Sequence, residues 1–128
     1  MAYASIHESP LFPETGSEKE TGTGNIFNAP IKSGTRGDEF LKIFESKILD
    51  PLDKVKPEIV LISAGFDAHI RDPLANINLE SADYFKITKK IMELANTHSK
   101  GRIISFFEGG YELQALSESV KEHLIALK

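Results

Sequence analysis

Two short segments of the sequence combine residue types that can bind a metal ion or stabilise a developing negative charge. In the first, residues 63–74 (SAGFDAHIRDPL), an apolar run is followed by Asp67 and His69. In the second, residues 107–111 (FEGGY), two glycines precede Tyr111. The glycines let the backbone come close to a ligand, and the tyrosine hydroxyl can donate a hydrogen bond. Both segments are therefore candidates for a reactive site.

The residue types in these segments have more than one interpretation. Asp67 and His69 are two residues apart, so an extended backbone would place them on one side as two metal ligands. An aspartate that caps a turn and a solvated loop histidine also explain this pair, because two ligands alone do not make a site. Tyr111 is either a catalytic hydrogen-bond donor or a packed tyrosine near a helix start. Asp72 precedes a proline, and an aspartate there readily organises a turn.

Each candidate segment follows an apolar run. Residues 59–62 are a continuous apolar run, and residues 103–107 are apolar apart from Ser105, as in parallel strands that are covered on both faces. In open parallel sheets, ligands bind beyond the carboxyl ends of the strands. The two candidate segments are therefore expected at such ends.

The remaining elements are predicted from residue spacing. Short strands are expected at residues 3–7 and 26–31, and apolar residues at helical spacing predict a helix from about 38 to 50. Ser81 can cap the next helix, and Gly101 stops it. A terminal helix carries an apolar stripe of Leu113, Leu116, Val120, Leu124 and Leu127. The alternation of strands and helices predicts an α/β domain with parallel strands and right-handed crossovers.

Prolines and glycines mark the breaks between these elements. Pro51 and Pro57 bracket the end of the first predicted helix. Residues 9–25 are too rich in proline and glycine for regular structure and form a long loop. Leu11 and Phe12 lie between two prolines in this loop, which indicates that the loop packs against another part of the protein.

Composition excludes several classes of function. The 128 residues and 41% apolar content fit one domain, and a net charge of −4 with scattered Lys and Arg gives no footprint for nucleic acid. The absence of cysteine excludes disulfides, thiolate zinc sites and a cysteine nucleophile. No stretch approaches the roughly 20 apolar residues of a membrane span, and no secretory leader is apparent, so a soluble cytoplasmic protein is expected.

The two candidate segments resemble the paired signatures of one enzyme family. Residues 63–74 followed by EGGYEL are similar to those of the histone deacetylase and acetylpolyamine amidohydrolase family. Upstream, SIHESPLFPETG, then NAP and GT, resembles the family's strand and Phe-Pro loop, so the resemblance covers nearly the whole chain. It implies a three-layer α/β fold with a mainly parallel sheet, of the arginase/deacetylase type. Residues 1–128 would be the C-terminal part of one such domain, with the N-terminal half missing.

The resemblance also implies roles for individual residues. Asp67 matches the family's third zinc ligand, and Tyr111 matches the tyrosine that polarises the acetamide carbonyl. His69 matches no ligand. Further matches are Phe12, an aromatic wall of the acyl-lysine tunnel, and Pro73, Leu74, Gly109 and Gly110, beside the substrate. Ser5 and Ile6 fall where the family binds a structural monovalent cation such as K⁺, largely through backbone oxygens.

This residue set suits amide hydrolysis. Zinc held by three protein ligands lowers the pKa of its bound water to roughly 7 and polarises a carbonyl. A tyrosine hydroxyl aimed at the developing oxyanion is typically worth about 3 kcal/mol of barrier. The resemblance therefore implies removal of acetyl or similar acyl groups from lysine side chains or polyamines.

Most of the family's catalytic set has no match in this sequence. The other two zinc ligands form an Asp-x-His element, and a His pair performs acid and base chemistry. Both lie upstream of the point that Met1 matches. The chain is thus expected to be inactive alone, with exposed strand edges that favour association with an N-terminal half or another copy. The alternative is a catalytically dead remnant that serves as a binding module. An unrelated nucleotide-binding domain is disfavoured, because no P-loop or Gly-x-Gly-x-x-Gly element is present.

Overall fold

The computed structural model describes all residues from 1 to 128, and it confirms the predicted α/β class with parallel strands. In chain order the elements are β1 (Tyr3–Glu8), β2 (Ile26–Ile31), α1 (Gly37–Phe44), the π-helical turn η1 (Glu45–Leu49), α2 (Asp50–Val55), β3 (Val60–Ala64), α3 (Ser81–His98), β4 (Ile103–Phe107) and α4 (Leu113–Ala126). The predicted strands and helices are all present.

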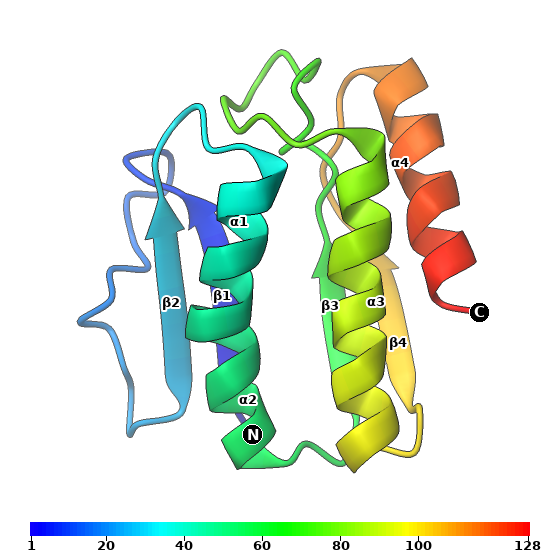
Figure 1. The fold of residues 1–128 in the computed structure, drawn as a ribbon. Coiled ribbons are helices and arrows are strands. Elements are labelled where there is room, and N and C mark those ends of the chain that lie inside the picture. Colours follow the sequence, from blue (N-terminus) through cyan, green and yellow to red (C-terminus); the bar gives the residue numbers. More distant parts are fainter.

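The strands form two separate parallel pairs. β1 pairs with β2, and β3 pairs with β4, with no ladder of hydrogen bonds between the pairs. All four strands point the same way (Figure 1). The segments that follow β1, β3 and β4 therefore lie at one end of the molecule, as expected for the carboxyl ends of parallel strands.

The long segment between β3 and α3 connects the two strand pairs at that end. Both the backbone N–H and the side chain of Asn76 donate to the Glu8 carboxylate at the end of β1, at 2.9 and 2.8 Å. The Asn76 carbonyl accepts from Gly34 N–H, and the Thr35 carbonyl accepts from Asn78 N–H. These bonds hold the two pairs together where the candidate segments lie.

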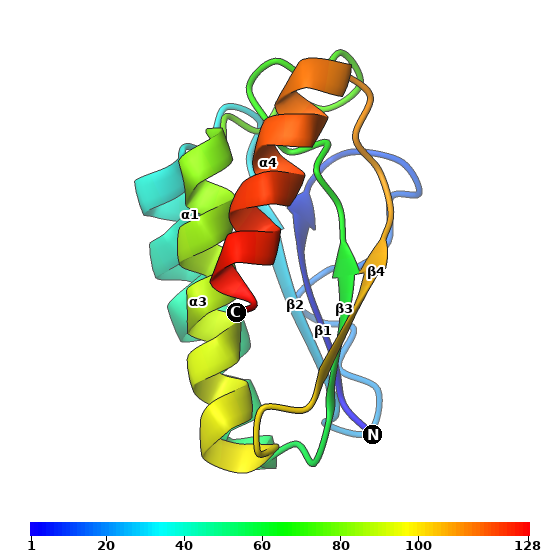
Figure 2. The ribbon, with the colours of Figure 1, turned by 90° about the vertical axis from the view of Figure 1, so that its right-hand side faces the viewer.

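All the helices cover the same face of the two strand pairs (Figure 2). One apolar core lies between the helices and the strands, and it includes Ile31 of β2, Phe44 of α1, Ala64 of β3 and Tyr84 of α3. Of the three layers expected for the fold, this chain contains the strands and the helical layer on one side.

The opposite face of β3 and β4 is uncovered. Leu61, Ile104 and Phe106 point to this face and expose 60%, 47% and 51% of their surface. The expectation that both strands are buried on both faces is therefore wrong for these 128 residues. A continuous apolar run is typical of a parallel strand that is covered on both faces, whereas the helices of this chain cover only one face.

The outer face of β1 and β2 is covered by residues 9–25. The Asn28 side chain donates to the carbonyls of Ser17 and Glu20, and Gly16 lies against the His7 ring. Phe12 in the same loop exposes 92% of its surface. The loop therefore packs against the strands as predicted, although its Phe12 side chain does not.

Two helix boundaries differ from their predictions. The first helix does not end near residue 50, because α1, η1 and α2 are continuous as far as Val55, which lies between the two bracketing prolines Pro51 and Pro57. Pro51 lies in the first turn of α2, after the π-helical turn has shifted the hydrogen-bond register, where a missing N–H costs little. α3 is capped by Glu80 in a capping box with Asp83, and not by Ser81.

The buried face of α4 differs from the predicted stripe. Leu113 and Leu124 are exposed, whereas Ala115, Ser119, His123 and Ala126 are buried. His123 Nδ1 lies 2.7 Å from Thr88 Oγ1 and its Nε2 lies 2.9 Å from Ser105 Oγ. These two bonds make the burial of a polar ring tolerable, which hydrophobic periodicity does not reveal.

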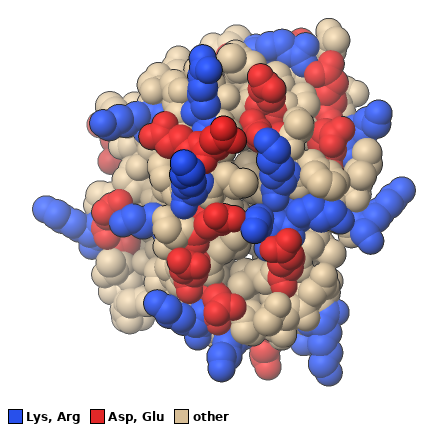
Figure 3. Space-filling view, viewed as in Figure 1, with Lys and Arg blue, Asp and Glu red and all other residues tan.

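The helical face is an ordinary polar surface. Lysine, arginine, aspartate and glutamate side chains are interspersed over it (Figure 3), which is typical of a face in contact with water. None of the helices is long and apolar enough to cross a membrane.

The buried His123 makes the stability of the fold dependent on pH. Burial lowers its pKa below the ordinary value of 6.5. The unfolded chain takes up a proton near pH 6.5, and the folded chain does so only at lower pH, so the free energy of unfolding falls as the pH drops below 6.5. His123→Gln should flatten this fall. Urea unfolding followed by far-UV circular dichroism from pH 7.5 to 5 measures it, and an unchanged pH dependence in the variant would contradict the prediction.

Candidate functional site

Phe66 anchors the segment that follows β3. Its N–H donates to the Gly109 carbonyl at 2.7 Å, and its carbonyl accepts from the Tyr84 hydroxyl at 3.0 Å. Burial raises the pKa of Tyr84, so this hydroxyl stays protonated and remains a donor. The Phe66 ring is 4% exposed and packs between Tyr84, Phe107 and His123. The residue that follows Phe66 is thus held against the end of β4.

That residue is Asp67, whose carboxylate is half-buried. Burial raises its pKa above the ordinary value, and the nearby charge of Asp72 acts in the same direction. No donor from another residue contacts the Asp67 carboxylate, so its burial is not offset by hydrogen bonds from its surroundings. Carboxylates in this situation are common at functional sites, where a cation or a substrate supplies the missing partner.

Asp67 and Tyr111 meet at Gly109. A Cβ atom built on Gly109 would lie 2.7 Å from Asp67 Oδ2 and 3.5 Å from Tyr111 Cε2. A side chain at Gly109 would collide with the Asp67 carboxylate, whereas the Tyr111 ring lies at an ordinary van der Waals distance from that position, so both groups border the same glycine. Gly110 has a φ of +145°, and a side chain there would collide with Leu116. The space that side chains at these two positions would need is thus filled by Asp67 and Leu116.

Asp72 joins the two candidate segments. One carboxylate oxygen accepts from Leu74 N–H at 2.9 Å, and the other accepts from Tyr111 N–H at 2.8 Å. The side chain is 9% exposed. The turn predicted for Asp72 is present, and the bond to Tyr111 is an additional role that the sequence did not reveal.

His69 is not a solvated loop residue, and it is not placed as a metal ligand beside Asp67. It is 4% exposed, its Nδ1 accepts from Arg71 N–H, and its Nε2 lies 3.1 Å from Ser81 Oγ. Burial and the Arg71 guanidinium lower its pKa. Both ring nitrogens are therefore used within the fold, and His69 helps to hold the start of α3 against the loop.

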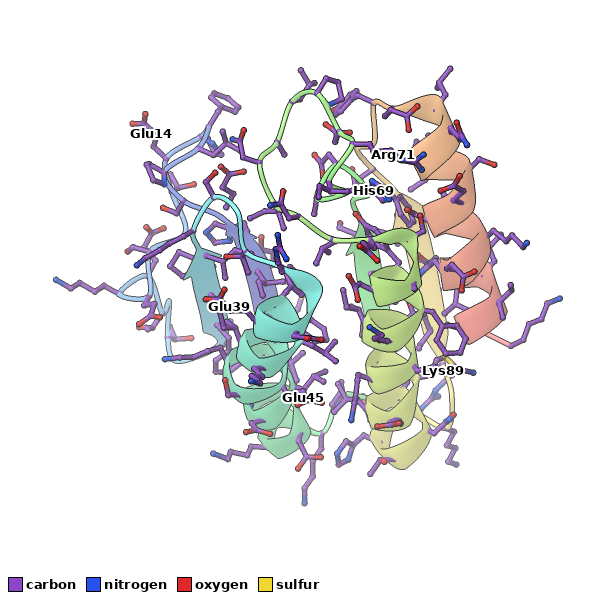
Figure 4. All side chains as sticks on the ribbon, turned by 45° about the horizontal axis from the view of Figure 1, so that its top comes forward. Glu14, Glu39, Glu45, His69, Arg71 and Lys89 are labelled. Atoms are coloured by element: carbon purple, nitrogen blue, oxygen red, sulfur yellow. The ribbon has the colours of Figure 1, made fainter.

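Arg71 ties the same loop to α4. Its guanidinium pairs with Glu118 and lies 3.6 Å from Glu112, whose side chain caps the start of α4. His69 and Arg71 lie close together beside the start of α4 (Figure 4). Ser81 also donates to Glu118, which completes a polar network around the two candidate segments.

The other residues matched to the substrate lie on the same end of the molecule. Pro73 and Leu74 are exposed in the loop that follows β3. Phe12 is exposed in the loop that follows β1, and Glu14 of that loop lies across this end from His69 and Arg71 (Figure 4). The structure thus places these side chains around one end but does not pack them into a closed tunnel.

Ser5 and Ile6, matched to the structural cation, lie in the middle of β1. The Ser5 hydroxyl is 2.9 Å from His7 Nδ1. Because β1 is paired on one edge only, alternate backbone carbonyls point away from its ladder with β2. Such carbonyls are suitable ligands for a hard monovalent cation.

The chain alone does not contain a zinc site. No group of three or more His, Cys, Asp or Glu side chains is arranged to hold a metal ion. Asp67 is an unpartnered carboxylate, whereas three protein ligands are the usual minimum for catalytic zinc. The residues present therefore fit one ligand position and no more.

The molecule also has hollows that are unrelated to this end. One lies between the first helix and α3 and is lined mainly by polar and charged residues, including Lys42, Glu45 and Lys90. A second lies beside Arg36 and Lys86. Neither contains Asp67 or Tyr111, and their charged linings indicate solvated surface.

Sequence reasoning did not identify four residues that shape this end: Phe66, Tyr84, Arg71 and Glu118. The only signal for Phe66 was its place in the Gly-Phe-Asp element. The other three act through contacts between segments far apart in the chain, which spacing does not show.

The arrangement has close counterparts among known proteins. The family model of the histone deacetylase domain matches residues 1–127. Histone deacetylase 14 of Arabidopsis thaliana, a chloroplastic protein, is 38% identical over 129 residues, which cover 98% of this chain and 30% of that protein. This chain therefore spans about a third of the length of such a relative.

Solved structures agree with this match. The HDA15 HD domain superposes with a TM-score of 0.86 at 28% identity, covering 98% of this chain and 37% of that one. An acetylpolyamine aminohydrolase from Burkholderia pseudomallei has the same fold, with a TM-score of 0.86 at 23% identity over 98% of this chain and 37% of its own. Sequence and fold together show that the chain belongs to the histone deacetylase family.

Proposed function

We propose that residues 1–128 are the C-terminal part of a single deacetylase domain that hydrolyses acetyl or related acyl amides of lysine side chains or polyamines. The observation that supports this best is the meeting of the Asp67 carboxylate and the Tyr111 ring at Gly109. Two groups that the family signatures predict to act together thus border the same glycine, although they follow different strands.

The two residues have separate roles in this proposal. Asp67 contributes one carboxylate to zinc, and the remaining ligands and the acid-base histidines come from the rest of the domain. The Tyr111 side chain is 55% exposed in this chain, so its hydroxyl is free to reach a bound acyl group. It donates a hydrogen bond to the substrate carbonyl oxygen, and this bond strengthens as negative charge develops there.

The substrate and cation residues complete the proposal. Phe12 and Leu74 are large exposed apolar side chains, and the exposed Pro73 lies next to Leu74. These side chains are suited to contact the methylene chain of an acylated amine. Gly109 and Gly110 would border the bound substrate. Ser5 and Ile6 mark the part of β1 where a potassium ion would bind, largely through the backbone oxygens that face the unpaired edge of the strand.

The uncovered face of β3 and β4 indicates where the rest of the domain binds. The matched segment is 30% of histone deacetylase 14 and 37% of the HDA15 domain. Roughly two thirds of each relative therefore lies outside it. Leu61, Ile104 and Phe106 are the apolar side chains that this additional part would cover. The same face favours association of copies when the rest of the domain is missing.

One alternative has its own support. Because no group of metal-binding side chains is complete in this chain, a catalytically dead module that binds a partner through the uncovered face is the second candidate. Deacetylase activity of the chimera described below would favour the first candidate over the second.

The first prediction concerns the chain alone. It should retain zinc only weakly and release no measurable acetate from acetyl-lysine peptides, because a single carboxylate does not hold catalytic zinc. Metal analysis after dialysis against zinc, together with an acetate assay, tests this. Stoichiometric zinc with zinc-dependent turnover would show that the rest of the domain is not needed.

The second prediction concerns a chimera in which residues 1–128 replace the matched segment of Arabidopsis histone deacetylase 14. Asp67→Ala should abolish zinc retention and activity together, since neighbouring groups cannot replace a ligand. Tyr111→Phe should keep zinc and lower kcat about 10²-fold to 10³-fold. Asp50→Ala, at an exposed aspartate on the helical face, is the matched control and should change neither. An active Asp67→Ala chimera would mean that the site is wrongly assigned.

The third prediction concerns the uncovered face. The isolated chain should self-associate, and the double variant Leu61→Lys, Phe106→Lys should be less associated, because charged side chains on an exposed strand face oppose stacking. Sedimentation velocity measures both. The exposed Leu113→Lys variant is the control for added charge elsewhere. A monomeric unmodified chain would show that this face needs no cover.

A further inference from the structure

Tyr111 has little in this chain to fix its position except its backbone. Its side chain is 55% exposed. The Gly109 carbonyl accepts from Phe66 N–H, but Gly110, with a φ of +145°, follows that bond and can rotate more freely than other residues, so the bond does not fix Tyr111. Tyr111 lies after the end of β4 and before the start of α4, so neither a strand ladder nor a helix holds its N–H.

Asp72 provides the constraint that is otherwise missing. Its Oδ2 accepts the Tyr111 N–H at 2.8 Å, across 39 positions of sequence, and its Oδ1 accepts Leu74 N–H at 2.9 Å. With 9% exposure the carboxylate is shielded from water, where a charge-assisted bond is strong. A single side chain therefore fixes both the loop after β3 and the backbone of Tyr111.

The neighbouring residue reinforces this link. Arg71 pairs with Glu118 of α4 and approaches Glu112, the residue after Tyr111. Glu112 in turn accepts from the N–H groups of Gln114 and Ala115 at the start of α4. The segment that carries Tyr111 is thus held on one side by Asp72 and on the other by the cap of α4.

We propose that Asp72 is a positioning residue that sets the orientation of Tyr111 relative to Asp67. Both of its partners are N–H donors, and each uses a different oxygen, so the position requires two acceptor atoms. An asparagine offers one oxygen and an NH₂ group, and it would leave one of the two N–H groups facing another donor. A catalytic role for Tyr111 rests on the proposed function, whereas the link between Asp72 and Tyr111 does not.

The link is tested by amide hydrogen exchange in the 128-residue chain, measured by NMR. In Asp72→Ala the Tyr111 amide should exchange about 10-fold to 100-fold faster, as expected for loss of a hydrogen bond to a charged group. The Ala115 amide, which Glu112 caps, should stay within about twofold and serves as the internal reference. Asp50→Ala is the control variant and should change neither amide.

Three results would overturn the proposal. The first is an unchanged Tyr111 amide in Asp72→Ala. The second is equal acceleration of Tyr111 and Ala115, which would mean that Asp72 stabilises the whole region and does not position Tyr111. If Asp72→Ala fails to fold, Asp72→Leu, which keeps the side-chain volume and removes both acceptors, decides: an unchanged Tyr111 amide in that variant is the third contrary result.

The effect on chemistry is measured separately in the chimera with histone deacetylase 14. Asp72→Ala, which removes both acceptors, should lower kcat about 10-fold while KM and zinc content stay within about twofold, because a displaced Tyr111 hydroxyl no longer points at the substrate carbonyl although no ligand is removed. A loss of zinc in parallel with kcat would contradict positioning of Tyr111. An inactive unmodified chimera would count against the proposed function only, since the exchange experiment does not depend on turnover.

Discussion

The burial of Phe66 is the constraint on which the rest of this end depends. Its ring fills the space between β4, α3 and α4, and its backbone is bonded on both sides, to Gly109 and to Tyr84. A side chain so enclosed cannot rotate without opening the core, so the direction of Asp67 is decided by packing. The packing of Phe66 thus holds the Asp67 carboxylate half-buried, in an environment that raises its pKa.

Parallel strands explain why two distant segments form one site. The ends of β3 and β4 lie side by side, so residues that follow them meet even though a whole helix separates them in the chain. Gly109 allows the closest approach, and Asp72 fixes it by bonding to Tyr111. The site is therefore held by one aromatic anchor, one glycine and one carboxylate.

The two faces of the strands have different meanings. One face of the strands is covered by the helices, whose outer surface carries the interspersed charges of a surface in water. The opposite face of β3 and β4 exposes large apolar side chains, which is the composition of an interface. The chain also lacks a complete set of metal ligands. In the proposed function, a further part of the deacetylase domain would account for both features.

The sequence by itself determined the α/β class, the places of all four strands, the two candidate segments and, through its signatures, the family. These depend on local periodicity and on short motifs, which a chain carries whatever its surroundings. Only the tertiary structure decided that His69 and His123 are buried, that Pro51 lies inside a helix, and that Leu61 and Phe106 face outward. It also decided the link from Asp72 to Tyr111. The physical reason is that burial and hydrogen-bond partners arise from segments far apart in the chain, and spacing along the sequence carries no record of which of them meet.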